Sequence, residues 1–352
     1  RGSLVADLAA LSLSGSAATA RDAAVQKIGG GWTKVTQGNV DGAIVDYLAA
    51  NTELAKIVAP PTLGYEARVA RLIEDAGARA CTARLACAAP AWAPSSYSVL
   101  VFGSASMSNG QTAGPVGVGG AASISSYAVA NTLSGDAARL AVAGSLSFGS
   151  GSVGIGGTGS IRVGGAASVT QSVGRRELLT GVATENFTAL KTWYQTLSTR
   201  IGQLPGTAAA HDGFGKYTLT GTSPTLNVFT ISGTALDSGH SLYFQVPDSA
   251  SVILNVTGTA AAFTNGQSYW NGVGMQNHPR AARILYNFPA AVGVSASGWS
   301  PQGTILAPNA AVTLSNGNVN GAIVVNTLTT SSAALACPAF EGTLPASVMP
   351  SP

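Results

Sequence analysis

Hydrophobic residues follow two different periodicities along the chain, and the change between them falls near residue 95. Residues 41–58 and 65–85 carry apolar side chains at about every third or fourth position, which is the spacing of one helix face. Pro60 and Pro61 separate the two patterns. Residues 1–94 are therefore predicted to form a helical N-terminal segment.

From Tyr97 onward, short runs alternate apolar and polar residues and are broken by glycines. The run YSVLVF at 97–102 is typical of a strand. The letters VGGAAS occur at 118–123 and again at 163–168, with a looser copy, VAGSLS, at 142–147. Repeats about 20 residues apart predict the coils of a β-solenoid, because one coil buries its inward row only against its neighbours.

The clearest repeat lies near the C-terminus. The segments Gly303-Thr-Ile-Leu and Gly321-Ala-Ile-Val are offset by 18 residues. Adjacent coils with this offset would place Ile305 over Ile323.

An apolar stripe at strict helical spacing interrupts the strands and predicts one amphipathic helix over residues 186–203. Thr184 or Asn186 is placed to cap its start, and Pro205-Gly206 ends it. We expect this helix to lie along one side of the solenoid, because a free helix would leave the stripe in water. The stripe comprises Phe187, Leu190, Tyr194, Leu197, Ile201 and Leu204.

The composition narrows the choice of partners. Charged residues make up 9% of the chain, against about 25% in ordinary soluble domains. The net charge of +3 is too weak and too dispersed to favour nucleic acid or an anionic membrane surface. No stretch reaches the roughly 18 consecutive apolar residues of a membrane span. With 44 glycines and a neutral polar surface, the chain is typical of a coat, adhesin or fibre-like protein.

Four segments follow one another in a recognisable order: YSVLVFGS, TLTGTSPTLNVFTISG, SLYFQVPDSASVILNVTG and PQGTILAPNAAVTLSNGNVNGAIVV. In this order they resemble the choice-of-anchor A domain of microbial surface proteins, an ice-binding-like adhesive domain. The resemblance covers about residues 97–330 and is most specific over 302–325. It implies a right-handed parallel β-helix with a long helix alongside, in a protein that is exported and held at the cell surface. It does not imply catalysis.

The predicted fold is therefore mainly β, with a helical segment over 1–94, a β-solenoid with a flanking helix over 95–335, and a tail over 336–352. We expect an extracellular protein of surface adhesion or structural assembly that acts through neutral Ser-, Thr- and Asn-rich faces. Its partners would be copies of itself or a surface protein or glycan. The alternatives are a self-assembling subunit of a filament or coat, favoured by unpaired edges at the coil ends, and an ice- or polysaccharide-binding protein.

Candidate catalytic chemistry is sparse. Enzymes on β-solenoids need clustered carboxylates, and the acids of the strand-rich part are scattered. We therefore expect no enzyme activity and no cofactor. His211-Asp212, which precedes Gly213, is interpreted as a turn. The scattered acids are Asp136, Glu177, Glu185, Asp212, Asp237 and Asp248.

Pairs of threonines two residues apart suggest a flat face of the kind that binds ice. They occur at Thr218/Thr220, Thr220/Thr222 and Thr257/Thr259. Because these pairs do not recur at one coil offset, they argue against a regular ice-binding face, and threonine is in any case a good strand residue.

The three cysteines leave several pairings open. Cys81 and Cys87 are six residues apart and either form a local disulfide or stay buried thiols, and Cys337 is a third candidate partner for either one. The odd number leaves one thiol free or intermolecular. No histidine lies at metal-ligand spacing from a cysteine, so we expect no metal site.

One predicted loop, Asn265 to Ala282, is rich in aromatic residues. It either contacts a sugar or protein through Tyr269, Trp270, Asn271 and His278, or packs these side chains over an open coil end.

Two N-glycosylation sequons begin at Asn186 and Asn255. Asn255 alternates with Leu254 and Val256 on a predicted strand and is expected to point outward. It is therefore the stronger candidate for a modified residue.

Overall fold

The computed structural model describes residues 15–36, 46–47, 49–50, 53, 93–133, 137–237, 239–276, 278–336 and 339–350. The chain divides into two compact units, Arg1–Arg84 with Asn277–Pro279, and Leu85–Gln276 with Arg280–Pro352. Most of the predicted helix over 41–58, all of the one over 65–85, and the cysteines Cys81, Cys87 and Cys337 lie outside the described residues.

The first unit contains helix α2, Gly15–Thr36, which lies before the helices that the hydrophobic spacing predicts. Ala20, Ala24 and Ile28 are buried and follow one another at intervals of four residues. This spacing places them on a single helix face. Because two of these three residues are alanines, the stripe is weak in the sequence.

The second unit is mainly β and is built on a large parallel sheet, which fits a β-solenoid-like fold. Its first half comprises β1 (Val99–Val101), β2 (Ala105–Thr112), β3 (Val116–Val118), β4 (Ala122–Val129), β5 (Ala138–Val142), β6 (Leu146–Phe148), β7 (Gly151–Val153), β8 (Ser160–Val163), β9 (Ala167–Val169) and β10 (Leu178–Thr180). Its second half comprises β11 (Thr207–Ala208), β14 (Leu226–Ser232), β16 (Ser251–Thr257), β17 (Ala260–Thr264), β20 (Ile284–Asn287), β21 (Gly293–Ser297), β22 (Thr304–Asn320) and β23 (Ile323–Ala336).

A smaller sheet completes the second half. It comprises β12 (Ala210–His211), β13 (Lys216–Thr220), β15 (Ser241–Gln245), β18 (Ser268–Trp270) and β19 (Val273–Gly274). Short 3-10 helices lie at η2 (Ile155–Gly157), η3 (Gly233–Leu236), η4 (Pro279–Arg283) and η5 (Ala346–Val348). Among the described residues, neither α2 nor the second-unit helix α5 (Phe187–Gly202) has the length and hydrophobicity needed to cross a membrane.

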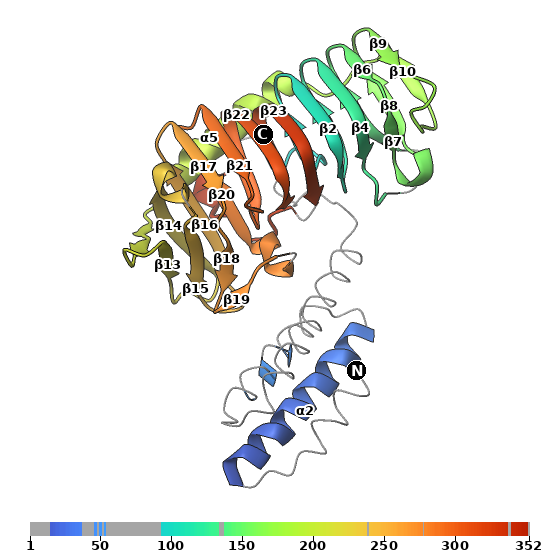
Figure 1. Cartoon of the computed structure of the whole chain (residues 1–352). Coiled ribbons are helices and arrows are strands. Elements are labelled where there is room, and N and C mark those ends of the chain that lie inside the picture. The colour runs from blue at the N-terminus through green and yellow to red at the C-terminus, as the bar shows by residue number, and fades with distance from the viewer. Residues whose placement is uncertain are drawn as a thin grey trace. The chain divides into compact units, whose positions relative to one another are not determined.

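The chain enters the large sheet in its middle. β1 pairs in parallel with β3 on one side and with β23 on the other, so the first strand lies beside the last. Figure 1 shows the same junction where β2 lies next to β23. One continuous succession of parallel neighbours results, in the order β10, β8, β5, β3, β1, β23, β22, β20, β16, β14 and β11.

The sequence repeats correspond to successive rungs, where a rung is the stretch from one strand to its next parallel partner. Val118 pairs with Val142, and Val142 pairs with Val163. Ile305 pairs with Ile323. Both predicted alignments are thus confirmed, because equivalent positions in the repeat occupy the same place in neighbouring rungs.

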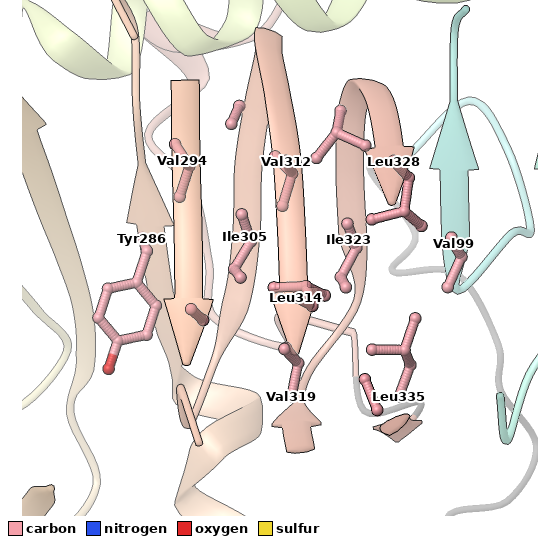
Figure 2. Packing of buried hydrophobic residues seen from close by; sticks show 14 of the residues in the cluster. Val99, Tyr286, Val294, Ile305, Val312, Leu314, Val319, Ile323, Leu328 and Leu335 are labelled. Atoms are coloured by element: carbon pink, nitrogen blue, oxygen red, sulfur yellow. The ribbon is translucent and has the colours of Figure 1, made fainter. Parts of the chain in front are cut away.

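Inward-facing side chains fill the space enclosed by the strands. Figure 2 shows Ile305, Ile323 and Val99 following one another across three paired strands, with Val312 and Leu328 on the strand segments opposite. All five are at most 1% exposed. At roughly 25 cal/mol per Å² of apolar area removed from water, such continuous columns are the main stabilising contribution to this fold.

Helix α5, Phe187–Gly202, lies on the outside of the large sheet, and the predicted flanking helix is confirmed. Asn186 caps its start by accepting a hydrogen bond from the Ala189 backbone N–H at 3.0 Å. The buried stripe packs on outward-facing residues of both halves of the sheet. The packed cluster contains Leu100, Phe102, Phe187, Tyr194, Leu197, Ile201, Ile253, Leu285, Leu306 and Val324.

The C-terminal residues also contribute to this cluster. Phe340, Leu344 and Val348 are buried beside the helix. Arg200 of α5 donates a hydrogen bond to the carbonyl of Met349 at 2.6 Å. The described residues of the predicted tail over 336–352 are therefore packed within the second unit, beside α5.

Candidate surface-binding site

Small hydroxyl residues line the outward side of eight strand segments on one side of the large sheet. On β2, Ala105 and Met107 are buried and Ser106 between them is exposed, as expected where side chains alternate between the two sides. Because the strands are in register, each such residue lies beside its counterpart in the next rung. The result, row one, runs through Ser295, Thr313, Thr329, Ser106, Ser123, Ser147 and Ser168, all exposed.

A second row lies two residues further along the same strands. Its members are exposed or partly exposed. Row two runs through Thr264, Ser297, Ser315, Ser331, Ser108 and Ser125. We call rows one and two together the hydroxyl face. Figure 1 shows the strands that carry it side by side: β17, β21, β22, β23, β2, β4, β6 and β9.

The geometry of this face follows from strand geometry. Neighbouring strands are about 4.8 Å apart, and residues two apart on one strand are about 6.6 Å apart, so the hydroxyls repeat on a nearly rectangular grid. An open hollow of about 690 Å³ lies over one part of row one and is lined only by Ser, Ala, Thr and Leu residues. A second hollow of about 380 Å³ lies over β17, β21 and β22 and includes Asp237.

The chemistry of the face is neutral and repetitive. Each hydroxyl both donates and accepts hydrogen bonds, and neither row contains a charged residue. Short side chains lose little conformational entropy when they are immobilised at an interface. The face is therefore suited to contact with an extended, regular, polar surface.

The sequence signal for this face lies in the repeats that end in serine and not in the threonine pairs. Ser123, Ser147 and Ser168 are the final letters of the three repeats VGGAAS, VAGSLS and VGGAAS. Thr218 and Thr220 lie on β13 of the other sheet. The regular positions are thus occupied mainly by serine and not by the threonine pairs, and the expectation about ice binding stays a prediction.

The two sequons have different environments. Asn186 is exposed and caps α5. Asn255 points outward from its strand, as predicted, yet it is only 3% exposed because α5 covers it. Its side-chain amide donates to the carbonyl of Ile201 at 3.0 Å. The preference for Asn255 as the modified residue is therefore wrong in this structure.

The predicted contact loop contains the strands β18 and β19 and the short helix η4. Trp270 is 1% exposed, with Phe244 as a neighbour at a ring-centroid distance of 6.1 Å, and His278 is 4% exposed. Neither side chain is available for contact with a partner. Tyr269 and Asn271 remain at the surface, so only these two members of the predicted group are accessible.

His211-Asp212 forms part of a turn, as interpreted from the sequence. A carboxylate oxygen of Asp212 accepts from the backbone N–H of Phe214 at 2.8 Å and of Lys216 at 3.1 Å. These backbone hydrogen bonds, that of Phe214 first, lower the pKa of Asp212. Within the ranges that the structure describes, no three His, Cys, Asp or Glu side chains are grouped to hold a metal ion.

Comparison with known proteins identifies one related family. A family model described as "Putative Ice-binding-like adhesive domain" matches residues 91–336, about seven-tenths of the chain. No curated protein and no solved structure shows a significant match. The match covers both halves of the large sheet, helix α5 and the hydroxyl face.

Proposed function

The chain belongs to the family of ice-binding-like adhesive domains, and on that premise we propose that it is a non-catalytic adhesion module that binds an extended surface through its hydroxyl face. The module acts outside the cell or at the cell surface. The partner surface that it binds is a crystalline or closely ordered glycan. The choice-of-anchor A assignment within this family stays a prediction.

The fold proposed for this module is a right-handed parallel β-helix. Support comes from the continuous succession of parallel strand pairs and from α5, which carries the chain back from the end of the first half to the start of the second. Right-handed crossovers between parallel strands are strongly preferred because of strand twist.

Row one is the observation that carries the proposal. An exposed hydroxyl recurs at one place in every rung from Ser295 to Ser168, across the junction of the two halves. A fold needs no such repetition on its solvent side, since any polar residue satisfies the alternation of a strand. Repetition at fixed spacing is what an ordered partner surface requires.

The first prediction concerns adhesion. Ser123→Arg introduces a long cation in the middle of row one, which cannot lie flat against a surface without desolvating its charge. We expect the bound fraction of the full chain on microcrystalline cellulose or crystalline chitin to fall at least tenfold, as measured by depletion from solution.

Thr199→Arg is the matched control, because Thr199 is exposed on α5 and outside the hydroxyl face. Both variants should keep the melting temperature of the parent chain, since each changes an exposed side chain. Equal binding by both variants, or no binding of the parent chain to either solid, would refute the proposed role of the face.

Ice is the second candidate surface, and the regular spacing of rows one and two favours it. An ice-binding face would give thermal hysteresis and faceted ice crystals with the parent chain, and Ser123→Arg would abolish both. Unshaped ice with the parent chain would eliminate this candidate while leaving adhesion to a glycan open.

A further inference from the structure

A second surface of different chemistry lies on the outer side of the small sheet. Thr218, Tyr243 and Tyr269 occupy the same place in three successive strands. The two tyrosine rings stack, with centroids 4.3 Å apart and planes inclined by 10°. The ammonium group of Lys216 lies 4.5 Å from the centre of the Tyr243 ring. Lysine and two rings thus form a layered stack along the surface.

The stack ends next to a position without a side chain. Tyr269 pairs with Gly274 of β19 across an antiparallel hairpin. The hairpin turn is Asn271-Gly272, with φ values of 47° and 84°, as a tight turn of this kind requires. A Cβ atom built on Gly274 would meet nothing within 4 Å. Among the described residues, therefore, nothing near Gly274 covers the side of Tyr269 that is turned away from Tyr243.

Polar side chains surround this ring. The Tyr269 hydroxyl donates to Gln267 Oε1 at 2.8 Å. The Asn271 amide donates to the carbonyl of Val246 at 2.9 Å and to Asp248 at 3.0 Å, which fixes the turn beside the ring. Gln245, on the strand before, accepts from Thr220 at 3.1 Å. Tyr269 thus forms an aromatic platform, and the side-chain amides of Gln267, Asn271 and Gln245 form its rim.

We propose that the free face of Tyr269 binds a pyranose ring of a polysaccharide by stacking. The C–H groups on one side of a pyranose are apolar and slightly positive, which complements the electron-rich face of a tyrosine ring. Its hydroxyls match the donors and acceptors of Gln267 and Asn271. The platform is open and shallow, so it suits one unit of a long chain and not an enclosed small molecule.

Nucleic acid is a poorer occupant of the same platform. Bases also stack on aromatic rings, but single strands need a positively charged groove along their phosphates. Lys216 is the cation over the stack, and Asp248, next to Asn271, forms an ion pair with Arg280 at 2.7 Å. One lysine over the rings does not make the row of cations that a phosphate backbone requires.

This site is independent of the hydroxyl face, because it lies on the other sheet and uses none of its residues. It binds a single soluble glycan chain, whereas the hydroxyl face binds an ordered solid. The two proposals can therefore succeed or fail separately.

The test uses the full chain with cellohexaose, chitohexaose and hexagalacturonate, titrated by calorimetry and by NMR of the tyrosine rings. We expect at least one of them to bind with Kd of about 1 mM or tighter. Tyr269→Ala should weaken that binding at least tenfold, and Tyr269→Phe, which keeps the ring, less than threefold. Gly274→Leu should block it as strongly as Tyr269→Ala does.

Gly293→Leu is the matched control, because a Cβ at Gly293 also meets nothing within 4 Å and the residue lies on the large sheet. It should leave binding unchanged, and so should Ser123→Arg. Melting temperatures show whether the variants remain folded. Failure of all three oligosaccharides to bind at about 10 mM would overturn the proposal. Binding that survives both Tyr269→Ala and Gly274→Leu would also overturn it.

Discussion

Asn255 and Asn287 pair in register on neighbouring strands beneath the last turns of α5. Asn287 donates to Asn255 Oδ1 at 2.8 Å and to the carbonyl of Ser198 at 2.9 Å. Asn255 in turn donates to the carbonyl of Ile201, in the last turn of the helix. Two strand asparagines thus add side-chain hydrogen bonds to the end of α5, beside the backbone bonds from Gln203 to Arg200 and from Leu204 to Ile201.

At this scale we predict that Asn287→Ala destabilises the second unit by about 3 kcal/mol, because it removes the central partner of a buried network. Asn287 is fully buried and also accepts from the hydroxyl of Ser198 at 2.6 Å. Urea unfolding would measure the change. Asn309→Ala, at an exposed asparagine, is the control and should cost less than about 0.5 kcal/mol. Equal costs would contradict the network's importance.

At the scale of elements, five residues along the hydroxyl face, four of them within strands, have a left-handed backbone. Asn265, Asn316, Ser332, Asn109 and Ser126 all have φ between 50° and 53°. They lie at the corresponding place in successive rungs, directly after the members of row two. Asparagine tolerates this conformation better than serine does, because its side chain bonds locally to the backbone.

We therefore predict that Ser332→Asn stabilises the second unit by about 0.5 kcal/mol through relief of left-handed strain. Thermal unfolding would show a small rise in melting temperature. The same substitution at Ser331, an extended strand residue of row two, should have no stabilising effect. A rise at Ser331 equal to that at Ser332 would contradict the explanation.

At the scale of the whole second unit, two features hold the halves of the sheet together. β1 pairs directly with β23, and α5 packs on Leu100 of one half and on Leu306 of the other. Segments more than 200 residues apart in sequence are therefore neighbours, as Val99 and Ile323 show. We expect such non-local pairing to slow the folding of this unit, because loop closure costs entropy before contacts repay it.

Buried tyrosines within this unit predict sensitivity to alkali. Burial raises the pKa of Tyr194 to about 12, and desolvation likewise raises the pKa of Tyr97, Tyr127 and Tyr286 above the ordinary value near 10. Above about pH 10 the unfolded chain releases these protons and the folded chain retains them, so the free energy of unfolding should fall steadily as pH rises.

Urea unfolding between about pH 8 and about pH 11 would measure this fall, together with spectrophotometric titration of the phenols. Tyr194→Phe should flatten the dependence, because it removes one of the groups whose pKa differs between the two states. An unfolding free energy that stays constant over this range would show that the four phenols titrate normally.

Much of this architecture is determined by local sequence. The spacing from Phe187 to Leu204 predicted α5, and the repeated glycine-rich letters predicted which strands pair, since both depend on residues close together in the chain. Alternation along the strands also predicted correctly that Asn255 points outward. These are period-2 and period-3.6 patterns, and such patterns survive in a single sequence.

Only the tertiary structure decided which outward-facing strand residues are covered and which remain exposed. α5 buries Asn255, whose side chain bonds to the helix backbone. No described helix packs on row one, and its hydroxyls remain exposed. The register between rungs brings Ser106 next to Thr329, residues that no local pattern relates. Exposure and alignment depend on which distant segments meet. The repeats could therefore be recognised in the sequence, whereas the hydroxyl face that they carry could not.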